Sequence, residues 1–79
     1  MANWILKIND QQIETYPNDL TQRQATECRA NYTIADLADR KRLSKADRVT
    51  METPDGRTLH LDRPEICYLG MNDYRWIEG

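Results

Sequence analysis

The residues best suited to bind a ligand or partner are five closely spaced Lys and Arg residues. They lie within residues 33–49, which read TIADLADRKRLSKADRV. These five, out of eleven Lys and Arg residues in the chain, are Arg40, Lys41, Arg42, Lys45 and Arg48. Cationic side chains bind phosphates and carboxylates through charge-assisted hydrogen bonds. The spacing therefore predicts a basic binding surface, to which Arg57 adds a sixth cation from the base of a downstream hairpin.

Groups that could support catalysis are poorly placed in this sequence. His60, the single histidine, lies between two leucines of an alternating run, so it points away from their face with no nucleophile beside it. Asp36, Asp39 and Asp47 could form an acid/base pair or a metal cluster, but a helix cap and an i,i+4 pair with Arg40 explain such residues adequately. No glycine-rich phosphate loop occurs. We therefore expect a protein that is not an enzyme and has no cofactor.

Composition narrows the class of protein further. Cys28 and Cys67 belong to no CxxC or Cys/His cluster, so we interpret both as reduced apolar side chains rather than zinc ligands. A redox thiol or an intermolecular disulfide is the functional alternative. The apolar run that begins at Trp4 is broken by Lys7, which predicts neither a signal peptide nor a membrane span. A cytoplasmic location is the resulting expectation.

The hydrophobic pattern predicts a single α+β domain over residues 1–79. Apolar residues that alternate with polar ones predict strands, and Asn9-Asp10 and Thr53-Pro54-Asp55-Gly56 predict the turns between two pairs of them. The expected strands are Trp4–Ile8, 12–16, the two arms of a hairpin over 49–61, 65–69 and 74–78. Trp76 either fills the core with Trp4 and Ile8 or, with Tyr74, forms an exposed anchor for a partner.

Two short helices are expected between the strands. Thr21 and Gln24 form a capping box that begins the first helix, which should end near Ala30 and turn Ala25, Cys28 and Tyr32 inward. Thr33 and Asp36 repeat the cap pattern, so a second helix should end within residues 40–42. The predicted fold is a small antiparallel sheet of four to five strands with two short helices packed on one face.

The basic segment also resembles the helix-turn-helix motif of DNA-binding proteins. Residues 33–38 are similar to its first helix, and Leu43-Ser44 is similar to the pair that often begins the recognition helix. The sequence departs from the motif at Arg42, where the turn usually has Gly. It also departs at Val49, which lies one residue after the position where the recognition helix needs an inward apolar side chain. A net charge of -2 and a pI of about 5.3 also disfavour phosphate binding. A DNA-binding transcriptional regulator therefore remains the alternative to a protein-binding module.

In general organisation the chain is similar to small phage-encoded inhibitors of bacterial defence, the anti-CRISPR proteins. One such family begins with a strand like Trp4–Ile8, continues into a Thr-capped helix like residues 21–30, and closes with an Arg-Trp strand like Arg75-Trp76. The resemblance covers only part of the chain and transfers no functional residues. It implies binding to a nucleic-acid-guided complex, where the basic residues would occupy a phosphate path or meet acidic residues of the partner.

The sequence thus predicts a non-catalytic binding protein, of the phage type that inhibits a bacterial CRISPR-Cas complex through a basic surface. The expected partner is a protein or nucleoprotein complex, with direct binding to nucleic acid as the alternative and no membrane association. The chain itself is expected to be a monomer or a small homo-oligomer. A structural assembly component is a third class, which would form a defined oligomer.

Overall fold

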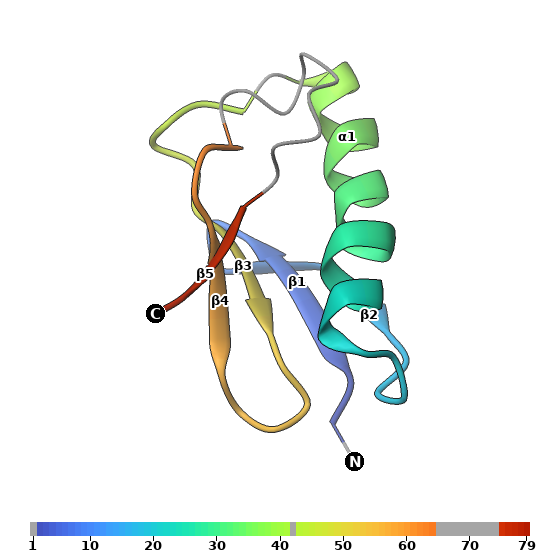
Figure 1. Ribbon diagram of the computed structural model, residues 1–79. Helices are drawn as coiled ribbons and strands as arrows, with labels where there is room; N and C mark the ends of the chain where they lie inside the picture. The colour runs from blue at the N-terminus through green and yellow to red at the C-terminus, as the bar shows by residue number, and fades with distance from the viewer. Residues whose placement is uncertain (1, 42, 65–74) are drawn as a thin grey trace.

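The computed structural model describes residues 2–41, 43–64 and 75–79, which form one antiparallel sheet with a helix on one face (Figure 1). The sheet has five strands in the order β2-β1-β3-β4-β5. In chain order the elements are β1 (Trp4–Ile8), β2 (Gln11–Tyr16), a π-helix η1 (Gln24–Ala30), α1 (Asn31–Arg40), β3 (Val49–Glu52), β4 (Thr58–Leu61) and β5 (Trp76–Glu78). The predicted α+β class is confirmed.

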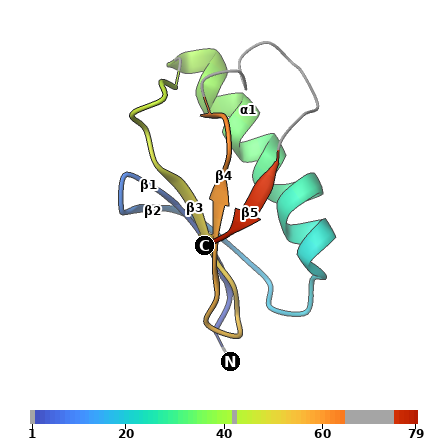
Figure 2. The same ribbon diagram turned by 60° about the vertical axis from the view of Figure 1, so that its left-hand side comes forward.

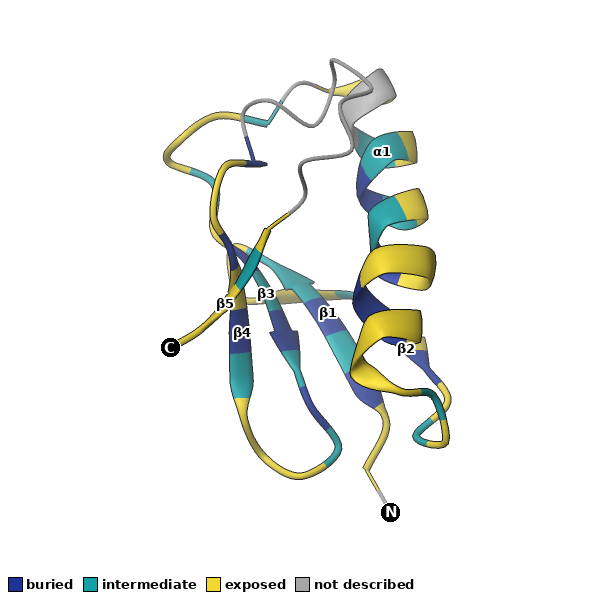
Figure 3. Ribbon diagram, in the orientation of Figure 1, coloured by how far each residue is buried: buried dark blue, intermediate teal, exposed yellow. Residues whose placement is uncertain are grey.

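Three residues from neighbouring strands form the centre of the core. Leu6 pairs with Met51 across β1 and β3, Met51 pairs with Leu59 across β3 and β4, and all three are fully buried. They belong to the same buried cluster as Ala30 and Ile34 of the helix, whose buried side turns toward the sheet (Figure 3). The alternation read from the sequence placed these side chains on the correct face, because successive residues of a strand point to opposite sides.

The two predicted turns are confirmed, and each depends on a residue that tolerates positive φ. Asn9 and Asp10 have φ of 52° and 67° between β1 and β2, a conformation that short polar side chains adopt more readily than others. Gly56, with φ of 92°, closes the β3–β4 hairpin. Thr53 supports that hairpin, since its Oγ1 accepts the backbone N–H of Arg57 at 2.8 Å.

The helix begins at the predicted capping box. The Thr21 N–H donates to Gln24 Oε1 at 2.9 Å, and the Gln24 N–H donates to Thr21 Oγ1 at 3.2 Å. Each side chain thus satisfies a backbone donor that has no partner within the first helical turn.

One continuous helix replaces the two short helices that the sequence predicted. Ala30 and Asn31, where the break was expected, both have right-handed helical dihedral angles, and the Asn31 N–H bonds to the carbonyl of Thr26. Thr33 caps nothing, because its hydroxyl donates to the Arg29 carbonyl at 3.3 Å inside the helix. A Ser or Thr within a helix commonly bonds the carbonyl four residues earlier, so a cap pattern alone does not mark a helix start.

The expected inward stripe of this helix is wrong at two of its three positions. Cys28 is exposed and Tyr32 is 80% exposed, and of the stripe only Ala25 is buried. The reason is the π-helical winding of η1, in which hydrogen bonds span five residues rather than four. The longer turn shifts the inward phase, so that Ala30 and Ile34 face the sheet in place of Cys28 and Tyr32.

The C-terminal strand is confirmed over Trp76–Glu78, where β5 pairs with β4. Trp76 is half-buried: it packs against the edge of the core, and its indole N–H donates to Asn31 Oδ1 at 3.3 Å, which favours the core interpretation over that of an exposed anchor. The predicted strand at 65–69, together with Cys67 and Tyr74, lies outside the described residues.

We predict that Ile34→Ala lowers the free energy of unfolding by about 2–5 kcal/mol, because it removes the one fully buried large side chain on the described part of the helix. Tyr32→Ala is the matched control, and we expect a change of less than about 0.5 kcal/mol at that exposed position. Urea denaturation of both variants, at a protein concentration low enough to keep the chain monomeric, measures the difference. Equal destabilisation by the two changes would contradict the helix phase described above.

Candidate binding surfaces

The basic residues predicted from the sequence divide into two groups in the structure. Arg40 ends α1, Lys41 follows it in extended conformation, Lys45 lies in a turn and Arg48 directly precedes β3. Arg57 lies on the β3–β4 hairpin at the opposite end of the sheet (Figures 1 and 2). We call residues 41–48 the basic loop; its member Arg42 lies outside the described residues.

The recognition helix that the helix-turn-helix interpretation requires is absent from residues 43–48. Instead the Asp47 N–H donates to the Ser44 carbonyl at 3.1 Å, and Asp47 Oδ2 accepts the Ser44 N–H at 2.7 Å. These bonds close a turn, after which Val49 joins the sheet. Ser and Asp side chains favour such local turns over helix because they offer the backbone alternative hydrogen-bond partners.

A set of hydrogen bonds fixes the basic loop to the β1–β2 turn. The Asn9 N–H donates to the Arg48 carbonyl at 2.8 Å, and the Arg48 N–H donates back to Asn9 Oδ1 at 2.9 Å. Asn9 Nδ2 also donates to Asp47 Oδ1 at 3.0 Å. We call these three bonds the Asn9 clasp. Sequence analysis found the turn at Asn9 but not this contact, because nothing local indicates a partner 39 residues away.

The described arginines of the predicted surface, Arg40, Arg48 and Arg57, already have acidic partners. Arg40 pairs with Asp36 at 3.3 Å across one helical turn, and Arg48 pairs with Asp10. Arg57 pairs with Asp55 at 3.0 Å and with Glu78 at 2.9 Å. All of these pairs are largely exposed, so each contributes little to stability.

The two lysines of the basic loop differ from these arginines in having no acidic partner on the described chain. Lys41 and Lys45 are exposed, and within the described parts of the chain neither has an ion-pair partner. Between the paired Arg40 and Arg48 the loop thus presents two ammonium groups without an ion-pair partner, and the charge of one of them, Lys41, contributes to lowering the pKa of Asp47.

The pKa of the Asp47 carboxyl is lowered by its position in the clasp. The largest cause is the hydrogen bond from the Asn9 side chain, followed by the backbone N–H of Ser44, and the nearby charge of Lys41 adds a smaller effect. Each of these favours the carboxylate over the neutral acid. The folded loop therefore stabilises the carboxylate form of Asp47 over the protonated acid.

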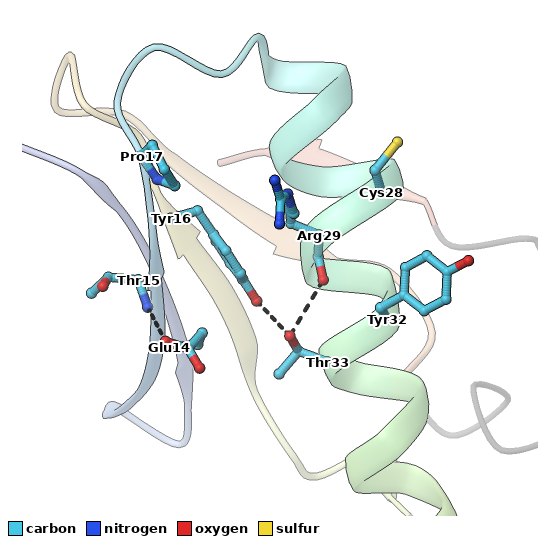
Figure 4. Close-up of a pocket in the computed structure, with 8 residues that line it drawn as sticks. All are labelled: Glu14, Thr15, Tyr16, Pro17, Cys28, Arg29, Tyr32 and Thr33. Atoms are coloured by element: carbon cyan, nitrogen blue, oxygen red, sulfur yellow. Dashed lines mark hydrogen bonds between the residues drawn. The ribbon is translucent and has the colours of Figure 1, made fainter.

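A second surface, which sequence analysis missed, is an open groove of about 470 Å³ between β2 and the helix (Figure 4). Glu14 and Tyr16 line it from β2, and Cys28, Arg29 and Tyr32 line it from the helix. It escaped notice because Cys28 and Tyr32 were expected to point into the core. The signal that could have revealed it is the Tyr itself, which fits poorly beside the small residues of the inward stripe.

Tyr16 forms the buried part of this groove. Its hydroxyl shares a hydrogen bond of 2.7 Å with Thr33 Oγ1, which joins β2 to the helix. Burial is the main cause that raises the pKa of Tyr16, and the bond to Thr33 opposes it. The phenol therefore stays neutral at physiological pH and acts as a hydrogen-bonding contact, not as an anion.

Comparison with known proteins gives no match to this chain among protein-family models, curated proteins or solved structures. Within residues 2–41, 43–64 and 75–79, no three His, Cys, Asp or Glu side chains gather in a way that could hold a metal ion. No helix in the described chain is long and apolar enough to cross a membrane.

We predict that the basic loop loosens at acid pH. The pKa of Asp47 in the folded protein lies below its ordinary value of 3.8. The contribution of its carboxylate to the stability of the loop is therefore present at neutral pH and is lost as the pH falls through the folded pKa. NMR titration of the Ser44 amide and the Asn9 side-chain amide measures the transition. Asp47→Asn should show the loosened loop already at pH 7, and a carboxyl of Asp47 that titrates at or above 3.8 would contradict the clasp.

Proposed function

We propose that this protein acts by binding a protein partner, without catalysis, through the basic loop and the adjoining end of α1. The observation that carries the proposal is the pair of exposed lysines, Lys41 and Lys45, which have no ion-pair partner on the described chain. Charges that are not neutralised internally are available to steer and orient a partner of opposite charge.

The Asn9 clasp favours binding because it holds the loop before the partner arrives. Ordering a flexible loop on association reduces affinity, whereas a loop that is already fixed avoids that loss. Here the ends of the loop are held by α1 on one side and by Asn9 on the other.

The distribution of charge favours protein over nucleic acid as the partner. Asp36, Asp10 and Asp47 lie among the cations, and two of them pair with Arg40 and Arg48. Affinity for nucleic acid comes largely from cations that neutralise phosphates, and interspersed carboxylates oppose it. A surface that carries both positive and negative charges instead matches a mainly acidic protein surface that also has some Lys or Arg residues.

The narrowest form of the proposal takes its partner from the resemblance to anti-CRISPR proteins. In that form the chain is a phage-type inhibitor that works in the bacterial cytoplasm. It binds an RNA-guided CRISPR-Cas complex, where the basic loop meets acidic residues or covers a phosphate path. Two observations support this form of the proposal. One is the order of strand, Thr-capped helix and Arg-Trp strand on which the resemblance rests, and the other is the pair of exposed lysines, Lys41 and Lys45.

Affinity capture from bacteria that produce a CRISPR-Cas complex, with and without nuclease treatment, tests the proposal. We expect the wild-type protein to capture the complex in both cases and to reduce plasmid interference in the same cells. Lys41→Glu/Lys45→Glu should lower capture at least about tenfold, because reversed charges repel an acidic partner. Arg23→Glu, at an exposed helix position away from the loop, is the matched control.

Two results would overturn this assignment. Capture that is unchanged by Lys41→Glu/Lys45→Glu would remove the basic loop from the contact. Capture that disappears with nuclease, together with duplex DNA binding that weakens steeply with salt, would identify nucleic acid as the partner.

A further inference from the structure

The groove between β2 and the helix carries one unpaired charge of each sign. Glu14 lies on the β2 wall and Arg29 on the helix wall, with Tyr16 between them (Figure 4). Both charges act electrostatically on Tyr16: the Glu14 carboxylate raises the pKa of the Tyr16 hydroxyl, and the Arg29 guanidinium lowers it. On the described chain neither side chain has an ion-pair partner.

We propose that this groove is the docking surface for a second copy of the chain, in a dimer with two-fold symmetry. A two-fold interface brings the same patch of both copies together, so a contact from residue i to residue j occurs twice. The groove satisfies this condition because Arg29 of each copy can meet Glu14 of the other. A different partner would need its own pair of charges in the matching arrangement, whereas a second copy has it by symmetry.

The edge of the sheet supports the same arrangement. Among the described residues β2 pairs with β1 alone, so within them its outer side is a free strand edge. At that edge the Thr15 N–H donates to the carboxylate of its neighbour Glu14 at 3.1 Å. When Glu14 turns to Arg29 of the second copy, the Thr15 N–H is released and can donate to a carbonyl of the second β2, as in strand addition to an exposed edge.

Tyr32 adds apolar contact area to the charge pairs. It is 80% exposed on the helix wall, one turn beyond Cys28, which is also exposed. An exposed tyrosine beside a groove is a frequent anchor of protein interfaces, because its ring offers a large contact area at low entropic cost. In the dimer each Tyr32 packs against the groove of the other copy.

Sedimentation equilibrium in the presence of a reductant, from about 1 μM to about 1 mM protein, measures the association. We expect a monomer–dimer equilibrium for the wild-type chain. Glu14→Arg and Arg29→Glu should each weaken it at least about tenfold, since each places like charges opposite one another twice. The exchanged variant Glu14→Arg/Arg29→Glu should restore the dissociation constant to within about threefold, because the pair is re-formed with its signs reversed.

Arg23→Glu is the matched control, as it reverses an exposed charge of the same helix outside the groove, and it should leave association unchanged. Tyr32→Ser tests the apolar contact without a change of charge and should also weaken the dimer. A monomer throughout the concentration range overturns the proposal. So does a dimer that both single reversals leave intact, or one that the exchanged variant fails to restore. Partner capture through Lys41 and Lys45 is a separate readout, so either proposal can fail while the other stands.

Discussion

The mutual hydrogen bonds between Asn9 and Arg48 are the constraint on which much of this structure depends. They join the β1–β2 turn to the residue before β3, next to the pairing of Ile8 with Val49 that sets the register of these central strands. A shift of one residue there would turn Met51 and its neighbours away from the helix. The same bonds fix the end of the basic loop, so the core and the proposed binding surface share one anchor.

The second constraint is that, in the described part of the chain, a single helix must cover the apolar face of a five-stranded sheet. Small residues at Ala25 and Ala30 allow the helix to lie close to the strands, while Ile34 supplies the large contact. The π-helical winding that brings Ala30 inward also turns Cys28 and Tyr32 to the surface. Such segments are common at functional sites, and here the winding creates the wall of the groove.

What could be predicted from the sequence is what depends on neighbours in the chain. Alternation placed Leu6, Met51 and Leu59 in the core, and the Thr21–Gln24 capping box began the helix at the right residue. The π-helical turn escaped prediction because its i→i+5 bonds leave no distinct pattern of residue types. The docking of Asn9 on Arg48 and the pairing of Arg57 with Glu78 escaped because they join residues far apart in sequence.

The central claim of this account is that the basic loop is a fixed surface rather than a flexible one. Amide hydrogen exchange at Arg48 tests it most directly, because this N–H lies outside the strands and is protected only by its bond to Asn9 Oδ1. The clasp predicts that the Arg48 amide exchanges about as slowly as the paired amides of β3. An Arg48 amide that exchanges as fast as an unprotected loop amide would contradict it.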